Sequence, residues 1–411
     1  MKHQRIRLFI AVACIVSVAA FTPAAYAIDV TAGDWKLSID GNVNAHYIYG
    51  RCDTTPNVIT GGLACTGADS SASSVSNGLL PAALSISGAT TQGAYDIGFT
   101  FGLYPGISTN DGGSPNNQTG ETRVHTALGT AGLDIRQVFL TFGNKDMGTV
   151  LAGRNIGLFQ ADAILNDMTL LGVGGDIAYA APTNTTLGSI GLGYIYTDWL
   201  AQIDYTTPDY WGAKATIGIF DPLNTLTQTP ASKKAPGIHA KLAYTLGPLY
   251  LSASGLYQQQ RNTAPVVPGF NPNYTSWAFD AGGKYDWGGL EVLGWYYDGK
   301  GVGTTGLFVN SDDGFGHPRN SDGYLVQVTY KFLDTKFGVN YGQSNLRPVG
   351  GDTGLTRAQL VGKNAKVTVG VYHDLTPNLI LLLEFTRIES QNQAQQENTS
   401  RNVNIGAFLK F

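Results

Sequence analysis

The sequence predicts an all-β protein, a transmembrane antiparallel β-barrel of sixteen strands. Three observations support this fold class. Apolar and polar residues alternate with a period of two in one segment after another. Short and long connections between these segments alternate along the chain. An export signal opens the sequence, and no later apolar stretch has the length that a helical span requires.

The first 27 residues are predicted to be a secretory signal peptide. The apolar stretch LFIAVACIVSVAAF precedes a small-residue cleavage site at Ala25-Tyr26-Ala27. One alternative is an uncleaved transmembrane anchor, but the apolar stretch is shorter than the about 20 residues that a helical span needs. The other is a lipoprotein cleaved before Cys14, but the preceding residues AVA are a poor match to a lipobox. The predicted mature domain is residues 28–411. The basic region of the signal contains Lys2, His3, Arg5 and Arg7.

The composition suits a barrel with one apolar and one polar face. Charged residues make up 14% of the chain, against about 25% in a typical soluble domain. Glycine and tyrosine are abundant, with 53 and 21 residues. Loss of the signal removes three of the 26 bases and none of the 30 acids, so the mature chain carries a net charge of −7. No basic run is present, so we expect no nucleic-acid partner.

The first predicted strand, WKLSIDGNVNAHYIY at 35–49, shows the alternation clearly. Alternation alone fits a soluble sandwich as well as a barrel. The signal peptide, the low charge and the alternating loop lengths favour the barrel. One face, which we expect to meet lipid or a neighbouring subunit, holds Trp35, Leu37, Ile39 and Val43. The other, which we expect to line water, holds Lys36, Asp40, Asn42 and His46.

The same pattern recurs to the end of the chain. A barrel of this size leaves an aqueous channel inside, and an even number of strands puts both ends on one rim. A further segment at 188–196 leaves a count of eighteen open. The sixteen predicted strands are 35–49, 79–90, 94–104, 133–143, 148–154, 199–206, 211–220, 237–246, 249–260, 276–286, 290–298, 322–332, 335–342, 364–373, 379–390 and 402–411.

The connections fall into two classes that alternate. Tight turns of a few residues, such as 144–147 and 207–210, lie between long polar segments. Outer-membrane barrels have such short turns on one rim and long loops on the other. Besides the longest, at about 155–198, the predicted long loops are 50–78, 105–132, 221–236, 261–275, 299–321, 343–363 and 391–401.

Two cysteines remain after the signal is removed. Cys52 and Cys65 lie in a polar, Gly-rich stretch of an exported chain, where a disulfide that closes a loop is expected. Reduced thiols or a metal site are the alternatives, although no His or further Cys lies close by in the sequence. We expect no metal and no cofactor.

Four stretches resemble the Gram-negative general porin family, and together they span nearly the whole mature chain. They are WKLSIDGNVNAHYIYG, RQVFLTFGNKDMGTVLAGR, LAQIDYTTPDYWGAKATIGIF and KVTVGVYHDLTPNLILLLEFTRIES followed by NVNIGAFLKF. The resemblance implies a homotrimer of sixteen-stranded, water-filled barrels in outer-membrane lipid. It also implies that the loop at about 155–198 folds into the pore. The terminal Phe411 is similar to the signal that such proteins show to the outer-membrane assembly machinery.

The resemblance further implies a constriction with acids on the loop and bases on the facing wall. Such an arrangement would produce a transverse field across the pore. The loop has no Lys or Arg, so we expect a weak cation preference, and each acid has the alternative of being a solvated loop residue. The chain lacks the dense arginine cluster of strongly anion-selective members, which leaves selectivity open. The predicted acids are Asp162, Asp167 and Asp176, together with Asp198, and the predicted bases are Lys36, Arg136, Arg154 and Lys214.

The predicted function is an outer-membrane channel of a Gram-negative bacterium for passive diffusion of small hydrophilic solutes and ions. The alternatives are a substrate-selective channel and a non-conducting structural or adhesin barrel. We expect no enzyme, because no motif singles out a Ser beside a His. The motif GVGTTG at 301–306 has no strand–helix context. The acidic stretch at 311–323 lacks EF-hand spacing.

Overall fold

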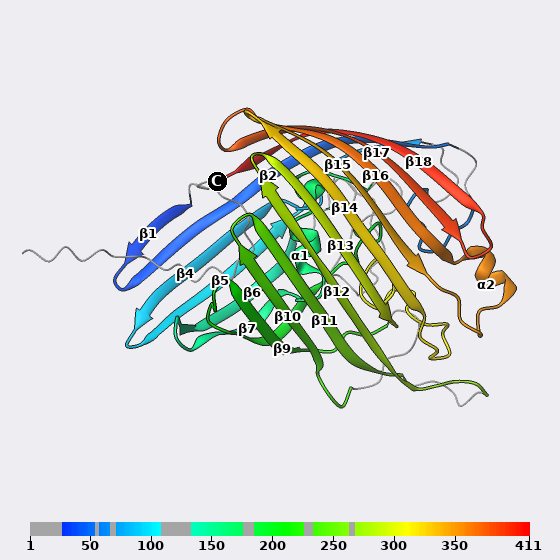
Figure 1. Cartoon of the computed structure of the whole chain (residues 1–411), viewed down its shortest axis with the longest axis horizontal. Coiled ribbons are helices and arrows are strands. Elements are labelled where there is room, and N and C mark those ends of the chain that lie inside the picture. Colours follow the sequence, from blue (N-terminus) through cyan, green and yellow to red (C-terminus); the bar gives the residue numbers. More distant parts are fainter. Residues whose placement is uncertain are drawn as a thin grey trace, which may run out of the picture.

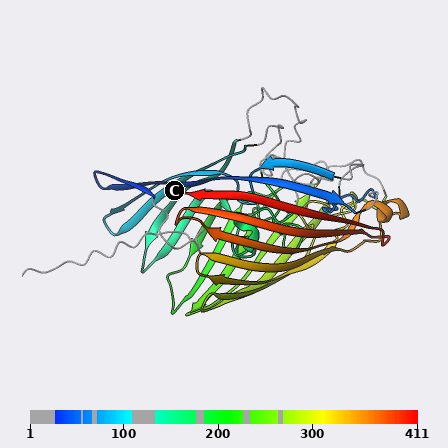
Figure 2. The same ribbon diagram turned by 90° about the horizontal axis from the view of Figure 1, so that it is seen from above.

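The structure is a computed structural model that describes residues 27–53, 57–65, 71–107, 133–175, 185–225, 233–262 and 268–411. Eighteen strands form one antiparallel sheet, which curls into a barrel of long, tilted strands (Figure 1). The view turned by 90° shows the long strands running from one rim to the other (Figure 2). Among the described residues, no helix is long and apolar enough to cross a bilayer.

Sixteen strands close the wall, as the sequence predicted. The closure is between the last strand and the first long one, where Leu409 pairs with Val43. In chain order the wall strands are β2 (Trp35–Cys52), β4 (Ala83–Gln92), β5 (Tyr95–Pro105), β6 (Leu133–Asn144), β7 (Gly148–Ile156), β8 (Trp199–Thr206), β9 (Ala213–Phe220), β10 (Gly237–Leu246), β11 (Leu249–Arg261), β12 (Asn273–Trp287), β13 (Leu290–Lys300), β14 (Asn320–Phe332), β15 (Thr335–Leu346), β16 (Val361–Asp374), β17 (Leu379–Asn392) and β18 (Glu397–Lys410).

Two short strands complete the edges of β2. The strand β1 (Ile28–Ala32) pairs with the start of β2, beyond the point where β18 ends. The strand β3 (Ser71–Ser76) pairs with the end of β2, beyond the reach of β4. Eighteen labelled strands therefore make a sixteen-stranded wall. The segment 188–196 forms only isolated bridges within the described residues, so it is not an additional wall strand.

The connections alternate as predicted, with one exception. Two-residue turns such as 93–94 and 247–248 lie on one rim, and the long loops lie on the other. The last connection was predicted to be long, at 391–401, and this prediction is wrong. The pairing of β17 with β18 continues to Gln391 and Glu397, which leaves only residues 393–396 as a turn. The helix α2 (Gly354–Gln359) also lies at the long-loop end (Figure 1).

The two faces of β2 are oriented as the alternation predicted. Val43 and Tyr47 are exposed on the outer face. On the inner face, Asn42 and His46 are buried among other parts of the chain. The inward side chains therefore meet packed protein in this part of the lumen, and not only water.

The C-terminus is bonded to β2 on the short-turn rim. The backbone N–H of Phe411 donates to the carbonyl of Gly41 at 3.0 Å, and Gly41 returns a bond of 2.9 Å. The disulfide between Cys52 and Cys65 is present, with a Cα–Cα distance of 6.0 Å, so this prediction is confirmed. It lies at the opposite end of β2, on the long-loop rim.

Candidate pore constriction

The third loop, residues 157–198 between β7 and β8, enters the barrel interior as predicted. Figure 1 shows its helix α1 (Ala161–Leu165) inside the ring of strands. A 3₁₀ turn, η1 (Met168–Leu171), follows. Gln160 adopts a left-handed backbone with φ of 61°, which turns the chain into α1. The loop then packs along the inner wall from β10 to β17.

Asp162 anchors α1 to the wall. Its carboxylate accepts hydrogen bonds from Ser252 Oγ at 2.6 Å and from Tyr250 OH at 2.9 Å. Lys241 Nζ lies 3.2 Å from the same carboxylate. These three groups come from β10 and β11. The carboxylate is thus held against the wall and does not project freely into the lumen.

A second anchor holds the start of α1 to β12. Asp280 accepts the backbone N–H of Gln160 at 2.6 Å and the Ser254 hydroxyl at 2.7 Å. Trp295 Nε1 also donates to this carboxylate at 3.4 Å. Asp280 is buried, so its bonds to the loop replace the water that a buried carboxylate would otherwise need.

Asp167 is used inside the loop itself. It accepts the N–H of Thr169 at 2.9 Å, which caps η1. It also accepts the Tyr194 hydroxyl at 2.9 Å and the Asn340 amide at 3.1 Å. The acid therefore joins two passes of the loop to β15 and is 3% exposed. This placement corrects the prediction that it faces water.

The far end of the loop is fixed to β16 and β17. Glu384 Oε2 accepts the backbone N–H groups of Val173 and Gly174, each at 2.9 Å, and Tyr372 OH donates to Oε1 at 2.6 Å. Lys366 Nζ donates to the carbonyl of Gly188 at 2.7 Å. Both charged side chains are almost completely buried.

The first loop, residues 53–82, covers the third loop. Leu79 N–H donates to the carbonyl of Gly172 at 2.8 Å, and Leu80 N–H to that of Leu170 at 3.1 Å. Nearer the disulfide, the N–H of Leu63 donates to Ser390 Oγ on β17 at 2.8 Å. The disulfide thus closes residues 52–65, which bind the wall, whereas residues 79–80 of the same first loop bind the third loop.

An apolar cluster fills the space between these elements. It contains side chains from both loops and from four wall strands, so a hydrophobic core lies inside the lumen. Its members include Ile48, Leu63, Leu79, Ala163, Ile164, Leu170, Val173, Leu187, Ile190, Leu192, Tyr194, Leu293, Trp295, Leu325 and Ile388.

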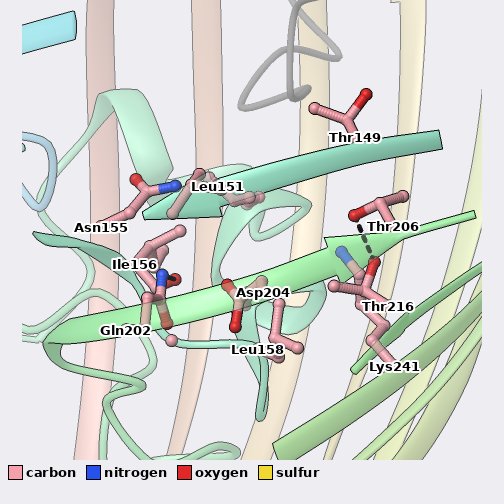
Figure 3. Close-up of a pocket in the computed structure, with 13 residues that line it drawn as sticks. Thr149, Leu151, Asn155, Ile156, Leu158, Gln202, Asp204, Thr206, Thr216 and Lys241 are labelled. Atoms are coloured by element: carbon pink, nitrogen blue, oxygen red, sulfur yellow. Dashed lines mark hydrogen bonds between the residues drawn. The ribbon is translucent and has the colours of Figure 1, made fainter. Parts of the chain in front are cut away.

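A solvent-facing pocket remains between the third loop and strands β7 to β10 (Figure 3). The hydroxyls of Thr206 and Thr216, on the adjacent strands β8 and β9, bond to each other on its wall side at 3.0 Å. Asp204 lies 2.8 Å from His239 Nε2, and Lys241 is 22% exposed at the edge. The remaining lining is Thr149, Leu151, Asn155, Ile156, Gly157, Leu158, Ala161, Leu165 and Gln202.

Arg136 points inward, as expected, but its guanidinium is enclosed. The ring of Tyr104 lies 5.0 Å away and that of Trp199 5.8 Å away, which is within the range of cation–π contacts. Asp134 pairs with it at 3.2 Å. Arg136 is 4% exposed, so it stabilises the wall near the third loop and adds little free charge to the lumen.

Lys36 and Lys214 lie near the short-turn rim, which corrects the prediction that they face the loop acids. Lys36 pairs with Asp29 at 2.8 Å and is 61% exposed. Lys214 lies 3.8 Å from Asp209 in the β8–β9 turn. Both were placed on the correct face of their strands. The alternation does not give the height of a residue relative to a loop, and this is why the prediction failed.

Arg154 is on the outer face, and the inward orientation predicted for it is wrong. Register pairs it with Val138 and Ala201, which are exposed outward. The inward set of β7 instead contains Leu151, opposite the buried Asp204. The fourth predicted acid of the loop, Asp198, is buried at the end of the loop, and Asp176 lies outside the described residues.

The structure therefore replaces the predicted opposition of acids and bases with a direct contact, Asp162 to Lys241. The sequence analysis did not single out Lys241, Lys366 or Glu384 as anchors. The signal was present, since all three occupy inward positions of alternating strands. Nothing in the alternation showed which of them a loop would reach.

A profile of the family described as Gram-negative porin matches residues 11–393. The chain belongs to the Gram-negative porin family. The porin resembles the outer membrane channel DcaP of Acinetobacter baumannii with a TM-score of 0.67 and 15% identity, covering 93% of this chain and 99% of that one. OmpF of Salmonella typhi, in complex with daunomycin, is similar with a TM-score of 0.59 and 12% identity. The match covers 93% of this chain and 100% of that one. OmpT of Vibrio cholerae is similar with a TM-score of 0.55 and 13% identity, and the match again covers 93% of this chain and 100% of that one.

At these identities the structural similarity concerns the fold. No curated protein matched the chain. Family membership places the porin in the outer membrane as a channel for passive diffusion. That the porin has no enzymatic activity stays a prediction.

Proposed function

We propose that the porin passes small hydrophilic solutes and ions through the opening between the third loop and strands β7 to β10. The observation that supports this most is the pocket itself. Its wall side offers three threonine hydroxyls, a carboxylate and a partly exposed lysine, and its loop side offers Leu158 and Leu165. Polar groups on one side and apolar groups on the other suit hydrated solutes that need few specific contacts.

Single-channel recording in a planar bilayer tests the proposal. We expect ohmic conductance from the folded protein, and a pure, folded sample that never conducts would refute it. That outcome would instead favour the non-conducting structural barrel. Partition of neutral polymers of increasing size would then give the width of the opening.

We further propose only a weak ion preference, for cations. The mature net charge of −7 favours cations, whereas the described acids of the third loop are held in contacts with the wall or with the loop itself. The two facts together argue against strong selectivity. The reversal potential in a KCl gradient measures the preference, and a clear anion preference would contradict it.

A homotrimer in outer-membrane lipid is part of the proposal. The fold resembles a structure of OmpT of Vibrio cholerae described as a trimer form, and the outer wall carries exposed apolar side chains that need lipid or a subunit beside them. Conductance that rises in steps of three and a slow-migrating unboiled band are the expected results. An unboiled sample that runs as a monomer would count against it.

Export and assembly are proposed from the sequence. Cleavage after Ala27 would leave a mature chain beginning at Ile28, which N-terminal sequencing of the outer-membrane form can check. Recognition of Phe411 by the outer-membrane assembly machinery predicts that removal of this residue slows assembly in cells. Equal assembly of the shortened chain would refute that role.

A substrate-selective channel is the second candidate, and a specific observation favours it. Both loops and their apolar cluster occupy much of the lumen, and Asp204 with His239 provides an oriented polar pair in what remains. Uptake rates for matched acidic, basic and neutral solutes separate the two candidates. Rates that depend on size alone support general diffusion, and a strong preference among solutes of equal size supports selectivity.

A further inference from the structure

Three arginines form a row on the outer face of the barrel. Arg51 on β2 pairs in register with Arg401 on β18, and Arg401 pairs with Arg387 on β17. Directly opposed residues on adjacent strands place their Cβ atoms about 4.5–5.5 Å apart on the same face of the sheet. All three side chains are exposed. We call this row the arginine ladder.

The ladder stands next to the apolar band of the wall. Two residues nearer the barrel centre on the same strands and the same face are Tyr49, Val403 and Phe385, which pair with one another in register. All three are exposed large apolar side chains. Aromatic side chains mark the interface between the hydrocarbon core and the headgroups. The ladder, one pleat farther toward the long-loop rim, is therefore at the level of the outer-leaflet headgroups.

The ladder has more cations than the nearby carboxylates neutralise. Like charges directly opposite on neighbouring strands destabilise a sheet. Asp53 pairs with Arg401 at 3.2 Å, and Glu389 lies 3.5 Å from Arg387 but also binds Lys363.

Arg51 stands apart from these pairs. Within the described part of the chain, it forms no ion pair. The exposed Glu397 accepts a hydrogen bond from Thr399. Among the residues that the structure describes, this end of the ladder thus has no carboxylate in contact.

A second like-charge pair on the outer face provides a comparison. Asp298 on β13 and Asp322 on β14 are also direct register partners. Here the chain supplies its own counter-ion, because Arg347 donates to Asp322 through Nη2 at 2.7 Å and Nε at 3.2 Å. The acidic pair thus has an arginine in direct contact with one of its two carboxylates, whereas Arg51 of the ladder has no ion pair within the described residues.

We propose that the arginine ladder binds the phosphate groups of an anionic, phosphorylated lipid in the outer leaflet. Guanidinium groups bind phosphate oxygens through two parallel hydrogen bonds, and adjacent arginines can share one phosphate or bind two. The bound lipid would relieve the repulsion along the row. Its acyl chains would lie against the apolar side chains at Tyr49 and Phe385. This inference does not depend on what passes through the pore.

The test uses the full mature porin in neutral detergent, with diphosphoryl lipid A as the probe, followed by native mass spectrometry. The triple variant R51Q/R387Q/R401Q removes the ladder, and R347Q removes an outer-face arginine of similar exposure that already has a carboxylate partner. We expect the triple variant to lose about tenfold or more in lipid affinity. We expect R347Q to bind as the wild type does. Conductance of both variants should be unchanged, because the substitutions lie outside the lumen.

A single substitution keeps the test valid if the triple variant misfolds. R51Q alone, at the position without an ion pair, should lose part of the affinity and keep the fold. Equal lipid binding by wild type, R51Q and the triple variant would overturn the proposal. Inorganic phosphate that binds the wild type as tightly as the lipid does would overturn the lipid assignment. Loss of the slow-migrating band with unchanged lipid binding would assign the ladder to a subunit contact instead.

Discussion

Two parts of the inner wall use the same alternation for different purposes. On strands β11 to β17, inward polar side chains such as Asp280 and Glu384 are buried and bind the backbone of the third loop. On strands β7 to β9, inward side chains such as Thr206 and Thr216 border the solvent-facing pocket. The comparison teaches that an inward polar residue of a barrel either lines water or anchors a loop. The choice between these roles depends on where the loop packs.

Substitution of Glu384 by Ala should have the largest effect. It removes the acceptor of two buried N–H groups, and each orphaned group costs about 1–3 kcal/mol. We expect the far end of the third loop to detach, with a loss of about 2–6 kcal/mol of stability and noisier single-channel currents. Urea unfolding of the refolded protein measures the first effect and planar bilayers the second.

A matched control for this prediction is Glu384→Gln, which keeps an acceptor oxygen and loses only the charge. Its stability should fall between those of the wild type and Glu384→Ala. If the alanine variant unfolds at the wild-type urea concentration, the third loop does not depend on this anchor, and the proposed division of the wall is wrong.

Removal of the disulfide should have the next largest effect. The double variant Cys52→Ser/Cys65→Ser opens a loop with a sequence separation of 13 residues. In the chain-entropy account, a disulfide that closes a loop of about 15 residues stabilises the folded state by about 3 kcal/mol. Because the first loop also binds Gly172 and Ser390, protease cleavage in the first and third loops should increase together. Cleavage confined to the first loop would show that it does not restrain the third.

Asp162 lies between the two parts of the wall and tests the electrostatics of the opening. Asp162→Asn leaves Lys241 without its carboxylate partner, so ion selectivity should shift toward anions. A unit charge at about 4 Å in water is worth about 1 kcal/mol, or about fivefold in permeability ratio at most. Reversal potentials in a KCl gradient measure the shift.

Two variants accompany this measurement. Lys241→Gln should shift selectivity in the opposite direction. Lys36→Gln should leave it nearly unchanged, since Lys36 is paired with Asp29 at the exposed rim, where such pairs contribute little. A large effect of Lys36→Gln with none from Asp162→Asn would move the selectivity site to the rim.

The smallest effect is expected for Thr216→Val. It breaks the hydroxyl bond to Thr206 in the pocket, and a single hydrogen bond contributes about 0.5–1.5 kcal/mol to stability. The substitution also makes the passage less polar, so conductance should fall slightly while the third loop keeps its protection from protease. Loss of protection would show that β9 helps to hold the loop.

The sequence determined the wall because the wall depends on a local, repeated pattern. The period of two gives the face of each residue within a strand, and clean strands such as β2 were oriented correctly. The strand β7 was not, because its inward face contains the apolar Leu151 and its outward face contains Arg154. With polar and apolar residues on both faces, the pattern could not give the orientation.

The candidate site depended on the tertiary structure. The loop acids Asp162 and Asp167 could be found from the sequence, but their side-chain partners lie between 27 and 173 residues away along the chain. The first loop was predicted to carry a disulfide, and its packing on the third loop was not predicted. Contacts between loops and distant strands have no period, so neither spacing nor composition indicates them.

By itself, therefore, the sequence determined a sixteen-stranded barrel, its two faces, its two rims and its disulfide, because strand alternation, turn residues and cysteine pairing are short-range features. Only the tertiary structure decided which inward charges meet water, which hold the third loop, and which arginines line up on the outer wall. Those outcomes follow from strand register and loop packing, which are set by the closed barrel as a whole.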